Sequence, residues 1–473
     1  MRTDCTEEQL TFQGLGRRAI VAEFSAGRLS SDAGGLLLLR EVAERTGVLR
    51  RFAQCFRDHR DPELIEHTVE ELLAQRVLAQ ACGYEDLNDH DVLRDDALLA
   101  VAAGKTDPTG AHRQRARDRG HGLAGKSTLN RLEGTPAEAT AAARYKKIVY
   151  DAAAIERVFV EAFLDAHATP PAEIVLDLDA TDDPLHGQQE GRFFHGYYRS
   201  YCYLPLYIFA GDFLLGAKLR TADGDGAAGA VEEVARLVGQ IRERWPTVPI
   251  VVRADSGFAR EELMAWCEAH EVDFVLGLAR NARLEAALTP ELAEAHAQLE
   301  ATGVPARVYK DFVYQTRKTW SRARRVVGKA EQLPGKANPR FIVTSYPAAR
   351  WAPAALYEDF YCARGDMENR IKEQQLGLFA DRTSTATMRG NQLRLWVAAL
   401  AYVLVNELRR VGLRGTALAR AQVGTIRTRL LKLGGLVRVS VRRVVVALSS
   451  VFPLQRLFAH ALANVQRAYP LRC

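Results

Sequence analysis

The fold of this chain is decided by the run Glu173-Ile-Val-Leu-Asp-Leu-Asp-Ala-Thr181, which is apolar apart from its acidic residues and its final threonine. Prolines lie close on both sides, as is typical of a buried strand bounded by turns. Side chains alternate along a strand, so Asp177 and Asp179 fall on one face. Two neighbouring buried carboxylates repel each other and lose water, so a cation or a proton must offset that cost. In the alternative interpretation the strand ends near Asp177, and both aspartates are solvated turn residues.

An α/β pattern follows this run and supplies a second acidic position. We expect further strands at 201–210, 213–219, 248–252 and 272–278, with helices at 227–245 and 260–270. Asp255 stands just after the 248–252 strand, within Arg253-Ala-Asp-Ser-Gly257. Because the carboxyl ends of strands in an open sheet gather ligands, we expect Asp179 and Asp255 to converge.

Length and composition describe an ordinary globular protein of two or three domains. The seven cysteines are scattered and form no Cys-x-x-Cys pair, which argues against a disulfide framework or a zinc knuckle and favours a reducing compartment. The N-terminus shows no apolar signal run, and the apolar run Leu395–Val405 is too short to cross a bilayer. We therefore expect a cytoplasmic protein with no membrane partner.

Basic residues are concentrated in three regions, although the net charge is only +6. Residues 408–473 contain thirteen Arg and Lys and no Asp or Glu, and the other two regions are 307–340 and 113–119. Charge runs usually form solvated faces, but three of them in one chain favour a polyanion as partner. None reads as a basic amphipathic helix, so nucleic acid is favoured over an acidic membrane surface.

The first third of the chain predicts a helical module. Two short strand-like pieces within 8–30 precede a helix over 36–48, which Ser30-Ser31-Asp32 would cap. Gly120–Ser127 also matches the phosphate-loop pattern, and the strand that ends at Asp177 could pass for its Walker B partner. The residues before Gly120 are too basic for a central strand, so we interpret the match as coincidental and expect no nucleotide cofactor.

A third carboxylate, Glu368, lies in a predicted helix far along the chain. Polar side chains recur there at helical spacing and would form one stripe, although a solvated helix face would explain them equally well. The stripe consists of Tyr361, Arg364, Glu368, Lys372 and Gln375.

These segments together resemble the DDE transposases. Tyr361-x-x-Arg364-x-x-x-Glu368 resembles part of the signature of the insertion-sequence-4-like superfamily, whose final lysine would fall at Gln375, with Lys372 one turn earlier. Asp179-Ala-Thr and Arg253-Ala-Asp255 resemble the segments that carry the first and second aspartates of that superfamily. The overall layout, with Leu29-Ser-Ser-Asp-Ala-Gly-Gly-Leu near the start and His195-Gly-Tyr-Tyr after the first strand, is similar to the IS1380 family.

The resemblance implies an α/β ribonuclease-H-like core with a β-rich insertion domain, preceded by an all-helical N-terminal domain. The implied division is a mainly helical DNA-binding domain at 1–168, core segments at 169–280 and 351–411, an insertion domain at 281–350, and a basic C-terminal region at 412–473.

The resemblance also implies a site and a reaction. Asp179, Asp255 and Glu368 would hold two Mg²⁺ ions, with Mn²⁺ as a substitute, ~3.5–4 Å apart as in two-metal phosphoryl transfer. Asp177 competes with Asp179 as the first ligand; otherwise it is a strand carboxylate paired with an arginine. The residues expected to contact DNA are Tyr361, Arg364, Lys372, Arg253 and Trp320, the last by stacking on a flipped base unless it is a core residue.

The expected function is that of a transposase that binds terminal inverted repeats and target DNA as a homodimer, associated with the nucleoid when bound. Two alternatives remain at this stage. One is a structure-specific nuclease on the same core, and the other is a non-catalytic DNA-binding regulator.

Overall fold

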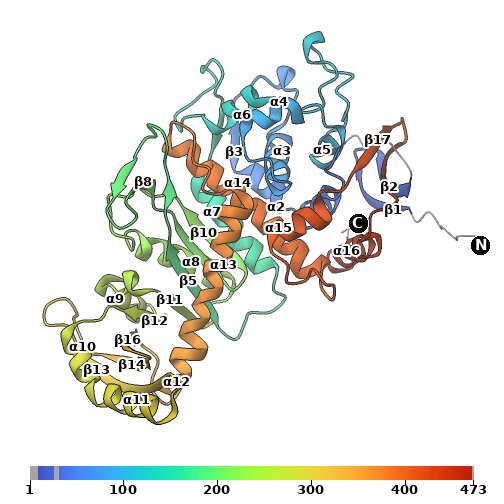
Figure 1. Cartoon of the computed structure of the whole chain (residues 1–473). Coiled ribbons are helices and arrows are strands. Elements are labelled where there is room, and N and C mark those ends of the chain that lie inside the picture. Colours follow the sequence, from blue (N-terminus) through green and yellow to red (C-terminus); the bar gives the residue numbers. More distant parts are fainter. Residues whose placement is uncertain (1–8, 26–30, 471–473) are drawn as a thin grey trace, which may run out of the picture. The chain divides into compact units, whose positions relative to one another are not determined.

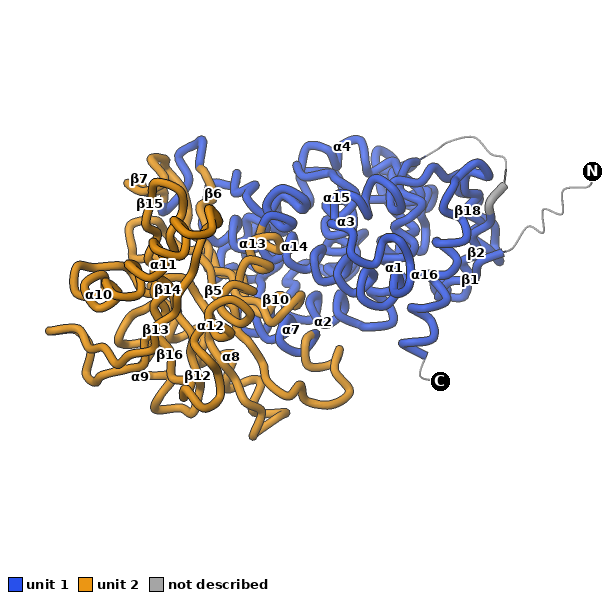
Figure 2. The backbone as a smooth tube through the Cα atoms, turned by 60° about the horizontal axis from the view of Figure 1, so that its bottom comes forward, with its two compact units in different colours: residues 1–162, 185–191, 372–473 blue, residues 163–184, 192–371 orange. Residues whose placement is uncertain are grey.

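The structure is a computed structural model that describes residues 9–25 and 31–470, and it comprises two compact units (Figure 2). Both units are discontinuous in sequence, which differs from the five consecutive segments expected. Unit 1 combines residues 1–162, 185–191 and 372–473, and unit 2 combines residues 163–184 and 192–371.

Unit 2 is built on one long mixed sheet that contains the opening run of the sequence (Figure 1). β5 pairs antiparallel with β9 and parallel with β11, and β11 pairs parallel with β12. This central position explains why Leu176 and Leu178 are fully buried. In order across the sheet the strands are β10 (Phe213–Lys218), β9 (Leu206–Ala210), β5 (Ile174–Ala180), β11 (Ile250–Ala254), β12 (Asp273–Leu278), β16 (Arg340–Thr344), β14 (Arg324–Leu333) and β13 (Ala306–Tyr314), and β15 (Lys336–Ala337) pairs with β14.

The strands of the expected insertion, 281–350, extend this same sheet. β16 pairs antiparallel with β12, so that Val275 lies opposite Thr344 and Leu278 opposite Phe341. The partner is needed because β12 is an apolar strand whose second edge would otherwise expose its backbone groups. The boundary expected at residue 280 therefore falls inside a continuous sheet.

Up to residue 302, the described part of unit 2 also contains four helices and a small second sheet. α8 has the amphipathic pattern expected from the sequence, with Val234, Leu237 and Ile241 fully buried. The elements are α8 (Ala230–Arg244), α9 (Glu261–Ala269), α10 (Ala282–Ala287), α11 (Thr289–Thr302), and the sheet β6 (Asp183–Pro184), β8 (Ser200–Tyr203) and β7 (Phe193–His195).

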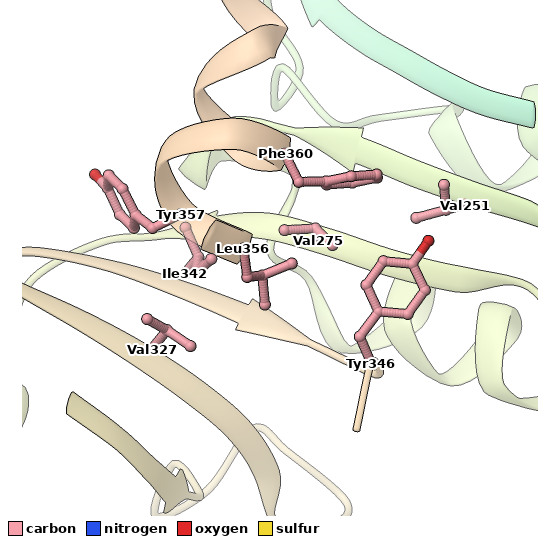
Figure 3. Packing of buried hydrophobic residues seen from close by; sticks show 8 residues of the cluster. All are labelled: Val251, Val275, Val327, Ile342, Tyr346, Leu356, Tyr357 and Phe360. Atoms are coloured by element: carbon pink, nitrogen blue, oxygen red, sulfur yellow. The ribbon is translucent and has the colours of Figure 1, made fainter. Parts of the chain in front are cut away.

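A helical segment from residue 353 onward lies against the long sheet. It consists of α12 (Pro353–Ala355), η5 (Leu356–Tyr361), η6 (Cys362–Arg364) and α13 (Gly365–Lys372). Figure 3 shows Leu356, Tyr357 and Phe360 of this segment facing apolar side chains of β11, β12, β14 and β16. Burying these aromatic and aliphatic side chains, at roughly 25 cal/mol per Å² of apolar surface, fixes the segment on the sheet.

Unit 1 is mainly helical, and it contains a four-stranded sheet built from both ends of the chain. The strand order is β1 (Leu10–Leu15), β2 (Arg18–Ser25), β18 (Arg443–Ser449) and β17 (Gly435–Val439). β18 runs parallel to β2 and places Val444 opposite Ile20. The two N-terminal strands were expected from the sequence. Their pairing with the basic C-terminal region was not.

The sequence predicted helices over much of the first third of the chain, and unit 1 has helices there. None of the described helices is both long and apolar enough to cross a membrane. They are α1 (Leu36–Thr46), α2 (Val48–Gln54), α3 (Val69–Ala81), α4 (His90–Leu93), α5 (Ala97–Ala102), α6 (Lys126–Glu133), α7 (Ala152–Asp165, whose end belongs to unit 2), α14 (Met388–Glu407), α15 (Val423–Ile426) and α16 (Gln455–Ala468).

The start of α1 differs from the expected side-chain cap. Its N-cap is Gly35, and Ser31 Oγ instead donates to Asp96 at 2.7 Å, while Ser30 lies outside the described residues. Gly34 N and Gly35 N donate to the carbonyl oxygens of Leu433 and Leu431 at 2.7 and 3.0 Å. A Cβ atom on Gly35 would overlap the backbone there, so glycine permits this close approach of two chain segments.

We predict that Gly35→Ala lowers the free energy of unfolding of unit 1 by about 1–3 kcal/mol, because the added methyl group overpacks this contact. Urea unfolding followed by circular dichroism measures the change. Gly424→Ala is the matched control, since a Cβ atom there meets nothing within 4 Å. Equal stabilities for the two variants would contradict the prediction.

Candidate active site

The register of two parallel strands brings two of the expected carboxylates together. β5 and β11 pair with Leu178 opposite Ala254, so the next residues, Asp179 and Asp255, lie side by side at the carboxyl ends of the strands. Asp255 is held there locally, because its carboxylate accepts a hydrogen bond from Gly257 N at 2.9 Å at the start of a 3₁₀ turn. The expected convergence of Asp179 and Asp255 follows from this register.

One pair earlier in the same register, Asp177 lies opposite Arg253. The guanidinium donates to both carboxylate oxygens, with Nε at 2.6 Å and Nη2 at 2.8 Å, and both side chains are more than nine-tenths buried. Arg253 Nη1 also donates to the carbonyl oxygen of Phe360. The Arg253 guanidinium is thus buried and joins β5, β11 and the helical segment, and its expected contact with DNA stays a prediction.

Asp179 has different surroundings. The pKa of Asp179 is raised to about 6, chiefly by burial; Arg364 opposes this rise, and the nearby carboxylates of Asp255 and Glu368 contribute to it. The carboxylate accepts a hydrogen bond from Ala180 N at 3.0 Å. A proton or a cation beside this group would relieve the repulsion that its neighbours create.

The helical segment contributes Tyr361, Arg364 and Glu368 to the same place. Arg364 Nη2 lies 4.0 Å from Asp255 Oδ2. Burial lowers the pKa of Arg364, but the charges of Asp179 and Asp255 and the Tyr361 side chain outweigh it, so the net pKa is raised. Tyr361 hydrogen-bonds Arg364, and its hydroxyl lies where a Cβ atom on Gly277 would be. The cluster beside Tyr361 thus consists of four charged residues that were expected in the site: Asp179, Asp255, Arg364 and Glu368.

The remaining expected site residues are Lys372 and Trp320. Lys372 is exposed at the end of α13, and Gln375 follows in the helical turn η7 (Glu373–Gly377). Trp320 is only 7% exposed, packs edge-on against Tyr314, and lies beneath the guanidinium of Arg324 at 5.5 Å. This burial favours the core alternative for Trp320, and its stacking on a base stays a prediction.

The donor chemistry of the cluster fits a hard divalent cation, because Asp179, Asp255 and Glu368 offer only carboxylate oxygens. Within the described residues, no three His, Cys, Asp or Glu side chains are spaced to hold one metal ion as they stand. Metal binding would therefore require these carboxylates to move closer together.

The basic region 307–340 is largely neutralised by acidic partners. Arg324 pairs with Glu261 and Glu268, and Arg325 pairs with Asp311. The exposed pair Arg317 and Lys318, after β13, has no acidic partner among the described residues. The charge run as a whole is thus mostly structural.

The phosphate-loop match has no phosphate-loop structure. No described strand leads into it, and the N-terminus of α6 is occupied by a carboxylate: Asp91 accepts from Lys126 N at 3.2 Å and pairs with Lys126 Nζ at 3.0 Å. This carboxylate takes the place that a phosphate needs. The interpretation as a coincidental match agrees with this geometry.

The family of the chain is identified by sequence comparison. The model of the family described as "Transposase DDE domain group 1" matches residues 12–470. The chain belongs to this family. It is accordingly a DNA transposase, an enzyme that cleaves DNA and transfers strands, and domains of this family use divalent metal ions. Family membership favours this function over the nuclease and the regulator considered above.

The other comparisons add little. A cryo-EM structure of a piggyBac transposase synaptic complex with hairpin DNA is similar at 11% identity and a TM-score of 0.40, over 91% of this chain and 85% of that chain. A likeness this loose supports no argument about the site. The search of curated proteins found no match.

We predict that Arg253→Met lowers the free energy of unfolding by about 3–5 kcal/mol, because it leaves Asp177 buried without a partner. The double variant Asp177→Leu/Arg253→Met should recover most of that loss. Arg260→Met is the matched control, since its pair with Asp225 is half exposed and contributes at most about 1 kcal/mol. A cost for Arg253→Met no larger than that of the control would contradict a structural role.

We predict a pH-dependent gain in stability from Asp179→Asn, measured by urea unfolding in EDTA. The folded-state pKa of Asp179, about 6, is above the ordinary value of 3.8, so ionisation of the folded protein costs stability as the pH rises through this window. The variant should be about 1–3 kcal/mol more stable above pH 6 and no more stable below pH 4. A gain that is the same at all pH values would contradict the cause given.

Proposed function

We propose that this transposase binds the terminal inverted repeats of its own element and cuts and joins DNA with two divalent cations held by Asp179, Asp255 and Glu368. Mg²⁺ is the proposed ion, with Mn²⁺ as a substitute. The observation that carries the proposal is the register of β5 and β11, which places Asp179 beside Asp255, together with the effect of Glu368 on the pKa of Asp179. Target DNA and a second copy of the chain complete the proposed assembly.

The sheet supports a ribonuclease-H-like core. In chain order, β5, β9 and β10 form an antiparallel series, and β11 and β12 then add in parallel on the other side of β5. The five strands thus lie in the order β10-β9-β5-β11-β12. Acidic residues at the ends of the two central parallel strands fit the site expected for that core.

Asp179 is proposed as the first ligand in place of Asp177. The Asp177 carboxylate is already compensated by a bidentate arginine and is 4% exposed. Among the described residues no arginine or lysine lies at hydrogen-bond distance from Asp179, and the carboxylates of Asp255 and Glu368 lie near it together with Arg364. A divalent cation would relieve that repulsion.

The chain's own residues would divide the work of the reaction as follows. The two bound cations would activate the attacking water or 3′-hydroxyl and stabilise the leaving oxygen. Arg364, whose planar guanidinium faces the carboxylates, would orient the scissile phosphate, and Tyr361 would hold Arg364 through their hydrogen bond. No covalent protein–DNA intermediate is needed.

Unit 1 offers a basic surface suited to the DNA beyond the cut. A hollow of about 850 Å³ is lined by several exposed cations and by one carboxylate among its described lining residues. Arg131 and Arg144 lie over the ring of Tyr145 at 4.7 and 4.9 Å. The charged residues of the lining are Lys126, Arg131, Arg144, Lys146, Arg394 and Asp86. Phosphate contacts at such a surface would support the expected DNA-binding role of the N-terminal segment.

We predict that Asp179→Asn, Asp255→Asn and Glu368→Gln each reduce cleavage by at least about a hundredfold, because each removes a charge that stabilises the reaction. The assay uses a labelled duplex carrying the inverted repeat that flanks the coding region, with Mg²⁺, and a binding measurement in parallel. Asp359→Asn, an exposed carboxylate on the same helical segment, is the control. A variant that cuts at the parental rate would show that its residue is not part of the site. Failure of the parent protein to cut with either Mg²⁺ or Mn²⁺ would contradict the whole proposal.

A further inference from the structure

A hairpin beside the proposed site exposes an unusual number of aromatic rings. β7 and β8 are joined by the turn at 196–199, and their small sheet begins with β6, the strand that follows β5 in the chain. Phe194, Tyr197 and Tyr201 are 56%, 84% and 45% exposed. Soluble proteins seldom leave several large apolar side chains together on the surface without a binding role.

The rings are held in defined positions. Phe194 lies opposite Tyr201 across the two strands, and their rings meet edge-on at 5.5 Å. Arg192 lies over the ring of Tyr201 at 3.9 Å. The turn is closed by Arg199 N, which donates to His195 O at 2.8 Å. Because the backbone pairing fixes Phe194 and Tyr201, these two rings lose little conformational freedom when a partner binds.

The base of the hairpin lies next to the first aspartate of the proposed site. Tyr198 and Ala180 pack against one small core of Cys202, Leu204 and Ala222. Ala180 is the residue directly after Asp179. The pKa of Tyr198 is raised to about 12, chiefly by burial, with smaller contributions from the charges of Asp182 and Asp179. All of these residues belong to unit 2, so the hairpin and Asp179 lie in one compact unit.

The charge of the hairpin suits a nucleic acid strand. Residues 192–203 contain Arg192, His195 and Arg199 and no Asp or Glu. Flat aromatic faces interleaved with arginines bind unpaired bases by stacking and neighbouring phosphates by charge, with little dependence on sequence. Aromatic rings and arginines also occur at protein interfaces. The position beside Asp179, where the DNA to be cut must lie, favours the strand.

We infer that the aromatic hairpin, residues 192–203, binds unpaired bases of the DNA strand at the cleavage site. Phe194, Tyr197 and Tyr201 stack on the bases, and Arg192 and Arg199 contact the adjoining phosphates. This inference rests on the proposed function and adds to it a place where the end of the duplex is held open.

The test measures binding of a single-stranded oligothymidylate that carries one 2-aminopurine, whose fluorescence is quenched on stacking. Phe194→Ala/Tyr197→Ala should weaken binding by about 5- to 150-fold for each stacked base and abolish the quenching. Phe194→Tyr/Tyr197→Phe keeps both rings and should retain both signals. Val304→Ala/Val313→Ala, at exposed apolar positions of the same unit, is the control for lost surface. If the double alanine variant fails to fold, Tyr197→Ala alone serves, because its ring is 84% exposed.

Unchanged affinity and quenching in the alanine variant would overturn the inference. So would loss of self-association at unchanged affinity, which would identify a surface for a second copy of the chain. This assay measures binding and not cleavage, so a failure of the catalytic proposal registers in the cleavage assay and a failure of this inference registers here.

Discussion

The site depends on the buried ion pair between Asp177 and Arg253. Its guanidinium bonds a carboxylate of β5, sits on β11, and reaches the carbonyl oxygen of Phe360 in the helical segment. These three elements are the ones that carry Asp179, Asp255 and Glu368. A buried pair contributes little net stability over an apolar pair of the same volume, but removing one partner is costly. The pair thus acts chiefly by holding β5, β11 and the helical segment in fixed positions relative to one another.

The same register sorts the acidic residues into two kinds. Asp177 lies opposite an arginine and is neutralised within the sheet, whereas Asp179, two residues later, lies beside Asp255. Burial raises the pKa of Asp179, the like charges of Asp255 and Glu368 add to the rise, and a cation beside it would relieve the repulsion. Arg364 supplies part of that charge from the helical segment, at 4.0 Å from Asp255. β5 therefore carries both a structural carboxylate, Asp177, and the proposed metal ligand, Asp179.

Sequence reasoning reached the parts of this arrangement that depend on periodicity. Apolar runs located β5, β11 and β12, and strand alternation put Asp177 and Asp179 on one face. It could not assign Arg253, because its partner is set by the register between strands distant in sequence. Nor could it place Trp320, whose burial depends on β13 and β14 joining the core sheet. The hairpin at 192–203 was not predicted; only its segment His195-Gly-Tyr-Tyr was noted, as part of a family resemblance. The pairing of β18 with β2 left no local signal.

The most direct test of the central claim is metal rescue at the first aspartate. Asp179→Cys replaces a hard oxygen ligand with a sulfur ligand, which tolerates Mn²⁺ better than Mg²⁺. The account predicts that this variant does not cut a labelled inverted-repeat end in Mg²⁺ and regains cleavage in Mn²⁺, whereas Asp177→Cys is not rescued by either ion. Rescue at Asp177 in place of Asp179, or parental cleavage by Asp179→Cys in Mg²⁺, would contradict it.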